Sequence, residues 1–230
     1  MSHPSQTSKI AVIVAGGVGV RMGADQPKQF LELDGKSILE RTIETFLRSY
    51  ADMQVILVLP QAHLEAGRES CQHVIGAERI RFTIGGETRF HSVQNGLQLI
   101  QEPAVVFVHD AVRCLLSISL IHRCFEQANR VGSAIPVIAA TDSIRVMEGE
   151  SSRSIPRSHV RLVQTPQTFR SELLLPAYDT DYRTEFTDEA SVVEATGNAI
   201  HVIEGEPQNI KITSPMDLLV ASEYLRSMHS

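Results

Sequence analysis

A glycine-rich segment near the amino end is the part of the sequence best suited to hold phosphate. Residues 15–23 read AGGVGVRMG and directly follow a short apolar run. Glycines let the backbone turn tightly and bring its N–H groups close to an anion. Gly17, Gly19 and Met22 have the spacing of a dinucleotide fingerprint, but Met22 replaces its last small residue, and no Walker lysine motif is present. We therefore expect a phosphate cradle here, with a plain glycine-rich turn as the alternative.

Two cations accompany this loop. Arg21 lies within it, and Lys28 follows in the segment Pro-Lys-Gln-Phe. Two positive side chains beside a triphosphate suit nucleotidyl transfer, in which the α-phosphorus is attacked in line and negative charge builds on its equatorial oxygens. We expect Arg21 and Lys28 to be catalytic residues that stabilise this transition state. The alternative is that each is an ordinary solvated surface cation.

A second glycine pair is suited to a flat base. Gly85 and Gly86 leave room beside the backbone, and Thr88 and Ser92 offer hydroxyl groups a few residues later. For Thr88, capping of the helix that follows is an equally good explanation. This segment is therefore expected to line a nucleotide pocket.

Polar residues also follow the apolar run 104–108, where the sequence reads HDAVR. Groups at the carboxyl end of a parallel strand face the ligand crevice of an open α/β sheet. An acid there, Asp110, is suited to orient a ribose hydroxyl or a metal ion. We expect His109 to be a structural histidine.

Two further segments carry polar residues in unusual settings. Lys211 interrupts an apolar run at 209–212, where burial of its charge would be costly. Thr187 precedes Asp188 and Glu189 and is expected to cap a helix with acids in its first turn.

Alternating strands and helices must position these residues. Strands are predicted at 10–14, 55–59, 81–84, 104–108, 134–139, 199–203 and 209–212. Helices are predicted at 37–49, 61–74, 88–100, 117–130, 170–178, 187–196 and 214–227. This alternation predicts an α/β fold, with a Rossmann-like, mostly parallel sheet and helices on both faces. We expect a single domain over residues 1–230.

The alternation breaks at about 141–164. This stretch places Ser, Gly and Pro between two short alternating runs, which is typical of a hairpin that leaves the main sheet. A loop without strands is the alternative.

Composition excludes several classes of protein. A net charge of −6, from 21 Lys and Arg against 27 Asp and Glu, argues against a nucleic-acid binder. The three cysteines form no CxxC pair, so a disulfide framework or zinc site is not expected. No segment approaches the ~20 apolar residues of a membrane span, and the first residues lack the apolar stretch of a signal peptide. We therefore expect a cytoplasmic protein without a membrane partner.

The ordered motifs resemble those of the cytidylyltransferases of the methylerythritol phosphate pathway of isoprenoid synthesis. The matching segments, from about residue 10 to 226, are G-x-G-x-R-M, P-K-Q, G-G-x-x-R, H-D-A-x-R, T-P-Q, T-D-E-A and N-I-K-I-T. The chain departs from the usual pattern at Val20, where a basic residue is often found, and at Val112. It also has Val14-Ala15-Gly16 in place of Pro-Ala-Ala.

The resemblance implies an activity and its participants. CMP would pass from CTP to the sugar-alcohol phosphate 2-C-methyl-D-erythritol 4-phosphate, giving 4-diphosphocytidyl-2-C-methyl-D-erythritol and pyrophosphate. Mg²⁺ or another divalent cation would be held mainly by the triphosphate, with Asp110 as the one candidate side chain. The 141–164 stretch would be a protruding β-arm that clasps a second copy in a homodimer and contributes to its active site.

The resemblance also implies the roles of individual residues. The nucleotide-binding set is Ala15, Gly16, Gly17, Gly19, Gly85, Gly86, Thr88, Ser92, Asp110 and Ala111. The acceptor-binding set is Arg113, Ser143, Arg157, Thr187 and Lys211. Ser143 stands where the family has threonine. Arg157 is chosen by its spacing before Thr-Pro-Gln, and Arg153 and Arg161 are neighbouring alternatives.

Three other functions fit parts of the sequence. A ribitol 5-phosphate cytidylyltransferase would share the front half of the pattern, and the Thr-Asp-Glu-Ala segment favours methylerythritol phosphate instead. A nicotinamide-dependent oxidoreductase needs an acid at the end of a second strand, about 20 residues after the loop. Glu40 and Glu44 lie near that distance but in a predicted helix. A non-catalytic scaffold would leave Arg21, Lys28 and Lys211 unexplained.

Overall fold

Strand β1 (Ser8–Val14) lies inside the central sheet because both of its faces are apolar. In this computed structural model, which describes residues 7–16 and 26–229, Ala11 and Ile13 point to one core. Ile10 and Val12 point to the other, as the two-residue period of a strand requires. The sheet is therefore covered on both sides, as the sequence predicts.

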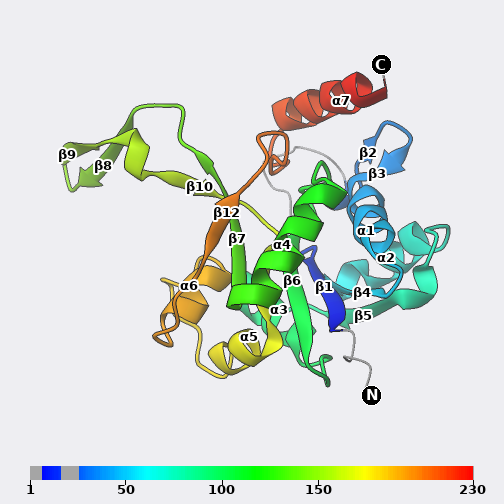
Figure 1. Ribbon diagram of the computed structural model, residues 1–230. Helices are drawn as coiled ribbons and strands as arrows, with labels where there is room; N and C mark the ends of the chain where they lie inside the picture. Colours follow the sequence, from blue (N-terminus) through cyan, green and yellow to red (C-terminus); the bar gives the residue numbers. More distant parts are fainter. Residues whose placement is uncertain (1–6, 17–25, 230) are drawn as a thin grey trace.

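Among the described residues, eight strands form one mixed, mostly parallel sheet (Figure 1). Its other members are β4 (Met53–Leu59), β5 (Ile80–Ile84), β6 (Ala104–Asp110), β7 (Ser133–Ala139), β10 (Arg161–Val163), β11 (Gln167–Arg170) and β12 (Val202–Glu204). The order is β10-β7-β11-β6-β1-β4-β5, with β12 beside β7. Strands β4, β1, β6 and β5 run parallel, whereas β11 is antiparallel to both β6 and β7.

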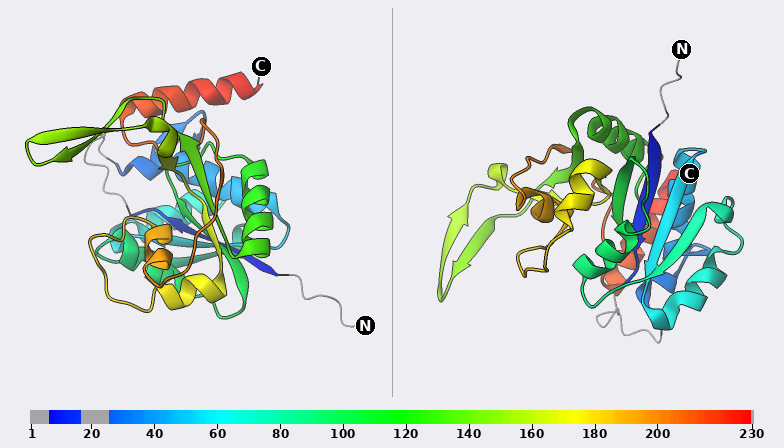
Figure 2. Two further views of the ribbon diagram at one scale, coloured as in Figure 1. Left: turned by 60° about the vertical axis from the view of Figure 1, so that its left-hand side comes forward. Right: turned by 90° about the horizontal axis from the view of Figure 1, so that it is seen from below.

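The helices divide between the two faces. One core contains residues of α1 (Ile38–Ser49), α2 (Leu64–Cys71) and α4 (Ile118–Val131). The opposite core contains residues of α3 (Arg89–Leu97), α5 (Ser171–Ala177) and α6 (Glu189–Glu194). Helix α7 (Pro215–His229) joins a smaller cluster with the β2–β3 hairpin (Glu32–Leu33 and Lys36–Ser37). Figure 2 shows these layers from two further directions.

Helix α1 illustrates how local sequence sets an element. Ser37 begins it by accepting the Glu40 N–H on its hydroxyl oxygen at 3.1 Å, which satisfies one exposed N–H of the first turn. Its apolar residues Ile38, Leu39 and Ile43 recur on one face and are fully buried.

The stretch that interrupts the alternation is a hairpin. Strands β8 (Ile144–Glu148) and β9 (Ser151–Ile155) pair only with each other, in an antiparallel ladder. Both views of Figure 2 show this hairpin extending away from the sheet and its helices. The excursion ends sooner than 164, because β10 already pairs with β7.

Two local predictions are wrong. Residues 209–212 form no strand: Asn209 is buried and donates through Nδ2 to the Thr165 carbonyl at 2.8 Å, and Ile212 N–H donates to the Val112 carbonyl. These bonds tie the segment to loops, so it joins no ladder. Thr187 does not cap α6: Asp188 does, because its carboxylate accepts the Ser191 N–H at 2.9 Å while the Ser191 hydroxyl accepts the Asp188 N–H.

Within the described residues, no helix combines the length and the apolar character that crossing a membrane requires.

Candidate active site

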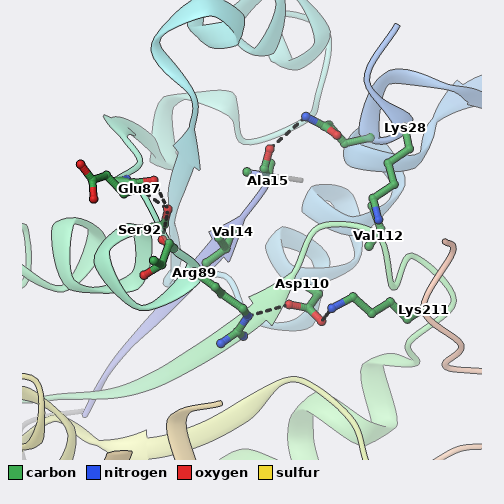
Figure 3. Close-up of a pocket in the computed structure, with 13 residues that line it drawn as sticks. Val14, Ala15, Lys28, Glu87, Arg89, Ser92, Asp110, Val112 and Lys211 are labelled. Carbon is green, nitrogen blue, oxygen red and sulfur yellow. Dashed lines mark hydrogen bonds and ion pairs between the residues drawn. The ribbon is translucent and has the colours of Figure 1, made fainter. Parts of the chain in front are cut away.

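The carboxyl ends of three parallel strands bring the predicted segments together. Val14, the last residue of β1, is paired with Asp110, the last residue of β6. Strand β5 ends at Ile84, so Gly85 and Gly86 emerge at the same edge of the sheet. This convergence places a pocket of about 260 Å³ at the edge where α/β sheets bind ligands (Figure 3).

Eight of the predicted site residues line this pocket: Ala15, Gly16, Lys28, Gly86, Thr88, Ser92, Asp110 and Lys211. Five residues that the sequence analysis left without a role also line it: Val14, Gln29, Glu87, Arg89 and Val112. Gly17, Gly19 and Arg21 lie outside the described residues.

The start of the glycine loop is fixed from two sides. The Ala15 N–H donates to the Val58 carbonyl at 2.9 Å, which completes the last pair of the β1–β4 ladder, Val14 with Val58. The side-chain amide of Gln29, which is buried, donates to the Ala15 carbonyl at 2.9 Å. Gln29 stands beside Lys28 in the short 3-10 helix η2 (Lys28–Phe30), so the same hydrogen bond also places Lys28 at the pocket. Gln29 belongs to the Pro-Lys-Gln motif, of which only the lysine had an expected role.

The second glycine pair is shaped by Ser92. Its hydroxyl oxygen accepts the Gly86 N–H at 3.1 Å and the hydroxyl donates to the Thr88 carbonyl at 2.9 Å. A Cβ atom at Gly85 would lie 2.9 Å from the Ser92 oxygen, and one at Gly86 would lie 2.4 Å from His91 Cβ. Both positions therefore need glycine for close packing. Ser92 is buried, and these two hydrogen bonds of its hydroxyl fix the conformation of the 86–88 backbone.

Thr88 has the capping role that the sequence offered as an alternative. Its hydroxyl oxygen accepts the His91 N–H at 3.3 Å, and α3 begins at the next residue. Because Thr88 also lines the pocket, the cap and the proposed nucleotide contact belong to one residue.

Three cations surround the carboxylate of Asp110. Arg89 Nε lies 3.1 Å from Oδ1, and Lys211 Nζ lies 2.9 Å from Oδ2. Arg113 Nε lies 3.6 Å from Oδ2. Burial alone would raise the pKa of Asp110, but the charges of Arg89, Lys211 and Arg113 outweigh it and hold that pKa well below its usual range. Asp110 is therefore an ionised acceptor that orders positive side chains.

Arg89 also binds a second carboxylate. Its Nη1 and Nη2 lie 2.5 and 3.1 Å from the two oxygens of Glu189, which is fully buried on α6. The Tyr178 hydroxyl donates to Glu189 Oε1 at 3.2 Å. Burial lowers the pKa of Arg89, but Glu189 and Asp110 outweigh it and raise that pKa well above its usual value. Both residues stood in motifs of the sequence, but nothing in their spacing indicated that they meet.

His109 is a neutral structural residue. Burial lowers its pKa to about 3. Thr165 Oγ1 accepts the Asp110 N–H, so its hydroxyl is left to donate to His109 Nδ1 at 3.0 Å. Nε2 then donates to the Arg113 carbonyl at 3.2 Å. The sequence expectation for His109 is confirmed.

The described residues offer no cluster of three His, Cys, Asp or Glu side chains that would hold a metal ion. Asp110 is the one side chain that the sequence indicated as a possible metal ligand, and each of its two oxygens already pairs with a cationic side chain. This donor set does not fit a metal centre built by the protein.

Six described predicted residues do not line the pocket of the single chain. Ala111 lies beneath it in the core, and its carbonyl accepts the Thr42 hydroxyl at 2.8 Å. Arg113 supports the pocket from behind, through Asp110 and the Asn209 carbonyl. Ser143 and Arg157 flank the β8–β9 hairpin, where Arg157 donates to the Thr141 carbonyl. Thr187 is exposed in the loop before α6. The sixth, Gly85, packs against Ser92, which lines the pocket.

Comparison with known proteins gives one consistent result. The family model for IspD, 2-C-methyl-D-erythritol 4-phosphate cytidylyltransferase, matches residues 9–227. The chain is 46% identical to the enzyme of that name from Bacteroides thetaiotaomicron, over 93% of this chain and 98% of the relative. It is 42% identical to the one from Porphyromonas gingivalis W83, over 96% of this chain and all of the relative.

Solved structures agree with this result. The 2-C-methyl-D-erythritol 4-phosphate cytidylyltransferase of Francisella tularensis superposes with a TM-score of 0.79 at 32% identity, over 94% of this chain and 99% of that one. The enzyme of that name from Thermus thermophilus gives 0.73 at 33% identity, over 94% and 98%.

Proposed function

The chain belongs to the 2-C-methyl-D-erythritol 4-phosphate cytidylyltransferase family, and from this premise we propose that its two substrates meet in the pocket of Figure 3. It transfers CMP from CTP to 2-C-methyl-D-erythritol 4-phosphate, giving 4-diphosphocytidyl-2-C-methyl-D-erythritol and pyrophosphate. The ribitol 5-phosphate alternative is not favoured. The observation that carries the assignment of the pocket is the convergence of Lys28, Ser92 and Lys211 on it.

We place the CTP base and ribose beside Gly85, Gly86 and Ser92, because Gly86 and Ser92 line the pocket and Gly85 packs against Ser92. Asp110, the last residue of β6, and Ala111, the residue after it, suit the ribose side. The triphosphate then lies along the glycine loop that begins at Ala15, because backbone N–H groups in such a loop bind anions.

The chemistry is an in-line displacement. A phosphate oxygen of the acceptor attacks the α-phosphorus of CTP, a new P–O bond forms, and the bond between the α-phosphorus and its bridging oxygen breaks to release pyrophosphate. A phosphate dianion is already a nucleophile, so no covalent enzyme intermediate is required. Lys28 and Arg21 stabilise the charge that develops on the α-phosphate, so catalysis consists of positioning and charge neutralisation.

The acceptor phosphate binds beside Lys211. A partly exposed lysine at the pocket wall, oriented by Asp110 at 2.9 Å, can turn its remaining N–H groups toward a second anion. Arg113 supports the same carboxylate from behind. Thr187 is proposed to contact the acceptor from the loop before α6.

We propose a homodimer in which the β8–β9 hairpin reaches the second copy. Met147 is 67% exposed on this hairpin, and Leu162 and Val163 are exposed where it returns to the sheet. Exposed apolar side chains on a projecting element are suited to burial against another protein surface. Ser143 and Arg157 at its base would then reach the acceptor in the partner's site.

Mg²⁺, or another divalent cation, is proposed to arrive with CTP on the triphosphate oxygens, since Asp110 is engaged by cations. A cytoplasmic location is proposed from the cysteines of the chain. Cys71, Cys114 and Cys124 are free and buried, as expected in a reducing compartment.

The direct test is pyrophosphate release from CTP and Mg²⁺ with each acceptor. We expect turnover with 2-C-methyl-D-erythritol 4-phosphate and at most a small fraction of it with ribitol 5-phosphate. A crystal soaked with CTP should show density in the pocket of Figure 3, and density elsewhere would contradict the placement.

A further inference from the structure

The ion pair between Arg89 and Glu189 needs an explanation beyond helix stability. Arg89 is the first residue of α3 and Glu189 is the first residue of α6. A helix dipole disfavours a cation at its amino end, so α3 gains nothing from the charge of Arg89. The two residues are 100 positions apart and come from different helices, so their contact is a tertiary feature.

Glu189 reaches the pocket only through Arg89. Its side chain is fully buried, its described polar partners are Arg89 and the Tyr178 hydroxyl, and it does not line the pocket. Arg89 does line the pocket, and its third nitrogen, Nε, donates to Asp110 Oδ1 (Figure 3). The other oxygen of Asp110 is held by Lys211 and approached by Arg113.

We infer that Arg89 and Glu189 are positioning residues for the transfer reaction. Glu189 fixes the guanidinium of Arg89, the guanidinium and Arg113 fix Asp110, and Asp110 orients Lys211 toward the acceptor phosphate. The inference deepens the proposed function and rests on the acceptor role given there to Lys211.

The guanidinium geometry explains why an arginine stands here. Its two terminal nitrogens match the two oxygens of Glu189, which leaves Nε for Asp110. A lysine offers one nitrogen and cannot hold both carboxylates in fixed orientation. Glu189 also neutralises Arg89, so that this cation does not compete with Lys28 and Lys211 for the phosphates of the substrates.

The pair can be removed without leaving an unpaired buried charge, because Asp110 keeps Lys211 and Arg113 as partners. Replacing both members of a buried ion pair by apolar side chains of similar volume often preserves folding, whereas removing one member does not. We therefore choose the double variant Arg89→Met/Glu189→Leu. Its melting temperature should stay near that of the wild type.

Kinetics of this variant test the inference. We expect the KM for 2-C-methyl-D-erythritol 4-phosphate to rise about tenfold and kcat to fall between about tenfold and a hundredfold, because small misplacements of a substrate cost this much. The KM for CTP should rise by less than the acceptor KM, since the glycine loop and Ser92 are untouched and only Asp110 among the proposed CTP contacts loses a partner. A stably folded variant with normal constants would show that the pair is only structural and would overturn the inference.

A second variant covers failure to fold. Arg89→Lys keeps the positive charge but cannot hold both carboxylates, and it should show the same rise in acceptor KM with a smaller change in the KM for CTP. Normal kinetics in Arg89→Lys would also overturn the inference.

A double-mutant cycle tests the route through Lys211. We expect Lys211→Met to raise the acceptor KM, and we expect a smaller further rise from Arg89→Met/Glu189→Leu in that background than in the wild type. If the double change raised the acceptor KM by the same factor in both backgrounds, the two sites would act independently, and the proposed route from Arg89 through Asp110 to Lys211 would be wrong. If Lys211→Met alone left the acceptor KM unchanged, the proposed acceptor role of Lys211 would fail instead, which is a different result.

The matched control is the pair Lys9–Asp52. Lys9 is buried and its Nζ lies 2.8 Å from Asp52 Oδ2, at the end of β1 opposite to the pocket. The variant Lys9→Met/Asp52→Leu should keep all kinetic constants. A shift in acceptor KM equal to that of the Arg89 and Glu189 variant would show that loss of a partly buried ion pair far from the pocket has the same effect.

Discussion

The hydroxyl oxygen of Ser92 accepts the Gly86 N–H at 3.1 Å, so one side chain of α3 holds the backbone that we propose for the cytosine site. We expect Ser92→Ala to raise the KM for CTP by about tenfold, because a loop that loses this bond no longer presents its N–H groups in one geometry. Initial rates at varied CTP concentration measure it.

Ser49→Ala is the control for this change. Ser49 is also buried in a helix and donates to the Phe46 carbonyl at 2.6 Å, but it lies outside the pocket. Each alanine should cost about 1 kcal/mol of unfolding free energy. An equal rise in KM for CTP in both variants would contradict the role of Ser92.

Lys28→Ala tests the proposed catalytic cation. We expect kcat to fall by about a hundredfold or more, the loss seen when one transition-state donor is removed. The melting temperature should be nearly unchanged, because the change removes no core packing. Lys36→Ala, which breaks a partly exposed pair with Glu44, is expected to leave kcat unaltered. Near-normal turnover of Lys28→Ala would remove Lys28 from the mechanism.

Much of this arrangement could be predicted from sequence, since apolar periodicity is a local property. Strand β1 and the buried face of α1 follow from runs of adjacent residues. The segment 209–212 has the same apolar character, yet its backbone bonds go to loops. Whether an apolar run joins a sheet depends on free partners at the sheet edge, which a single segment does not reveal.

The site was predictable to the extent that its residues stand in short motifs. Lys28, Ser92 and Lys211 were expected at one site and line one pocket. The contact of Arg89 with Glu189 was not predictable, because it requires α3 and α6 to cover the same face of the sheet. The cap of α6 was misplaced by one residue, since Thr187 and Asp188 are both good caps and only the chain path decides.

The buried neutral His109 predicts a pH dependence of stability. Its pKa is about 3 in the folded chain against 6.5 for the free side chain. Between these values the unfolded chain binds a proton that the folded chain does not. The free energy of unfolding should therefore fall as pH falls below about 6.5, with a slope approaching 1.4 kcal/mol per pH unit from this residue.

Denaturant titrations of wild type and His109→Gln between about pH 4 and 6 measure this slope. The glutamine variant should lose stability less steeply in that window, because its side chain does not titrate. If stability fell equally steeply with pH in both proteins, His109 would bind its proton as readily in the folded chain as in the unfolded chain.

Chelation tests whether the proposed divalent cation is needed for turnover but not for folding. Because the described residues make no cluster for a metal ion, EDTA should abolish turnover without lowering the melting temperature. Added Mg²⁺ should restore the rate in proportion to the Mg²⁺–CTP complex. A drop in melting temperature on chelation would indicate a metal held by the protein itself.

Mixed dimers test whether Arg157 acts in the partner's site. If each site combines Lys28 of one chain with Arg157 of the other, then Lys28→Ala and Arg157→Ala are each inactive alone. A dimer of the two variants has one site with both changes and one site with neither. Random exchange of subunits in a two-fold dimer makes half of the dimers mixed, so about a quarter of wild-type activity should return.

The control mixture combines Lys28→Ala with Arg123→Ala in place of Arg157→Ala. Arg123 stands on α4, away from the hairpin, and pairs with Glu206, so its variant should be active without mixing. Sedimentation at micromolar concentration should show dimers for every variant. Failure of the Lys28 and Arg157 variants to regain activity, while they exchange as dimers, would show that both residues serve the same chain's site.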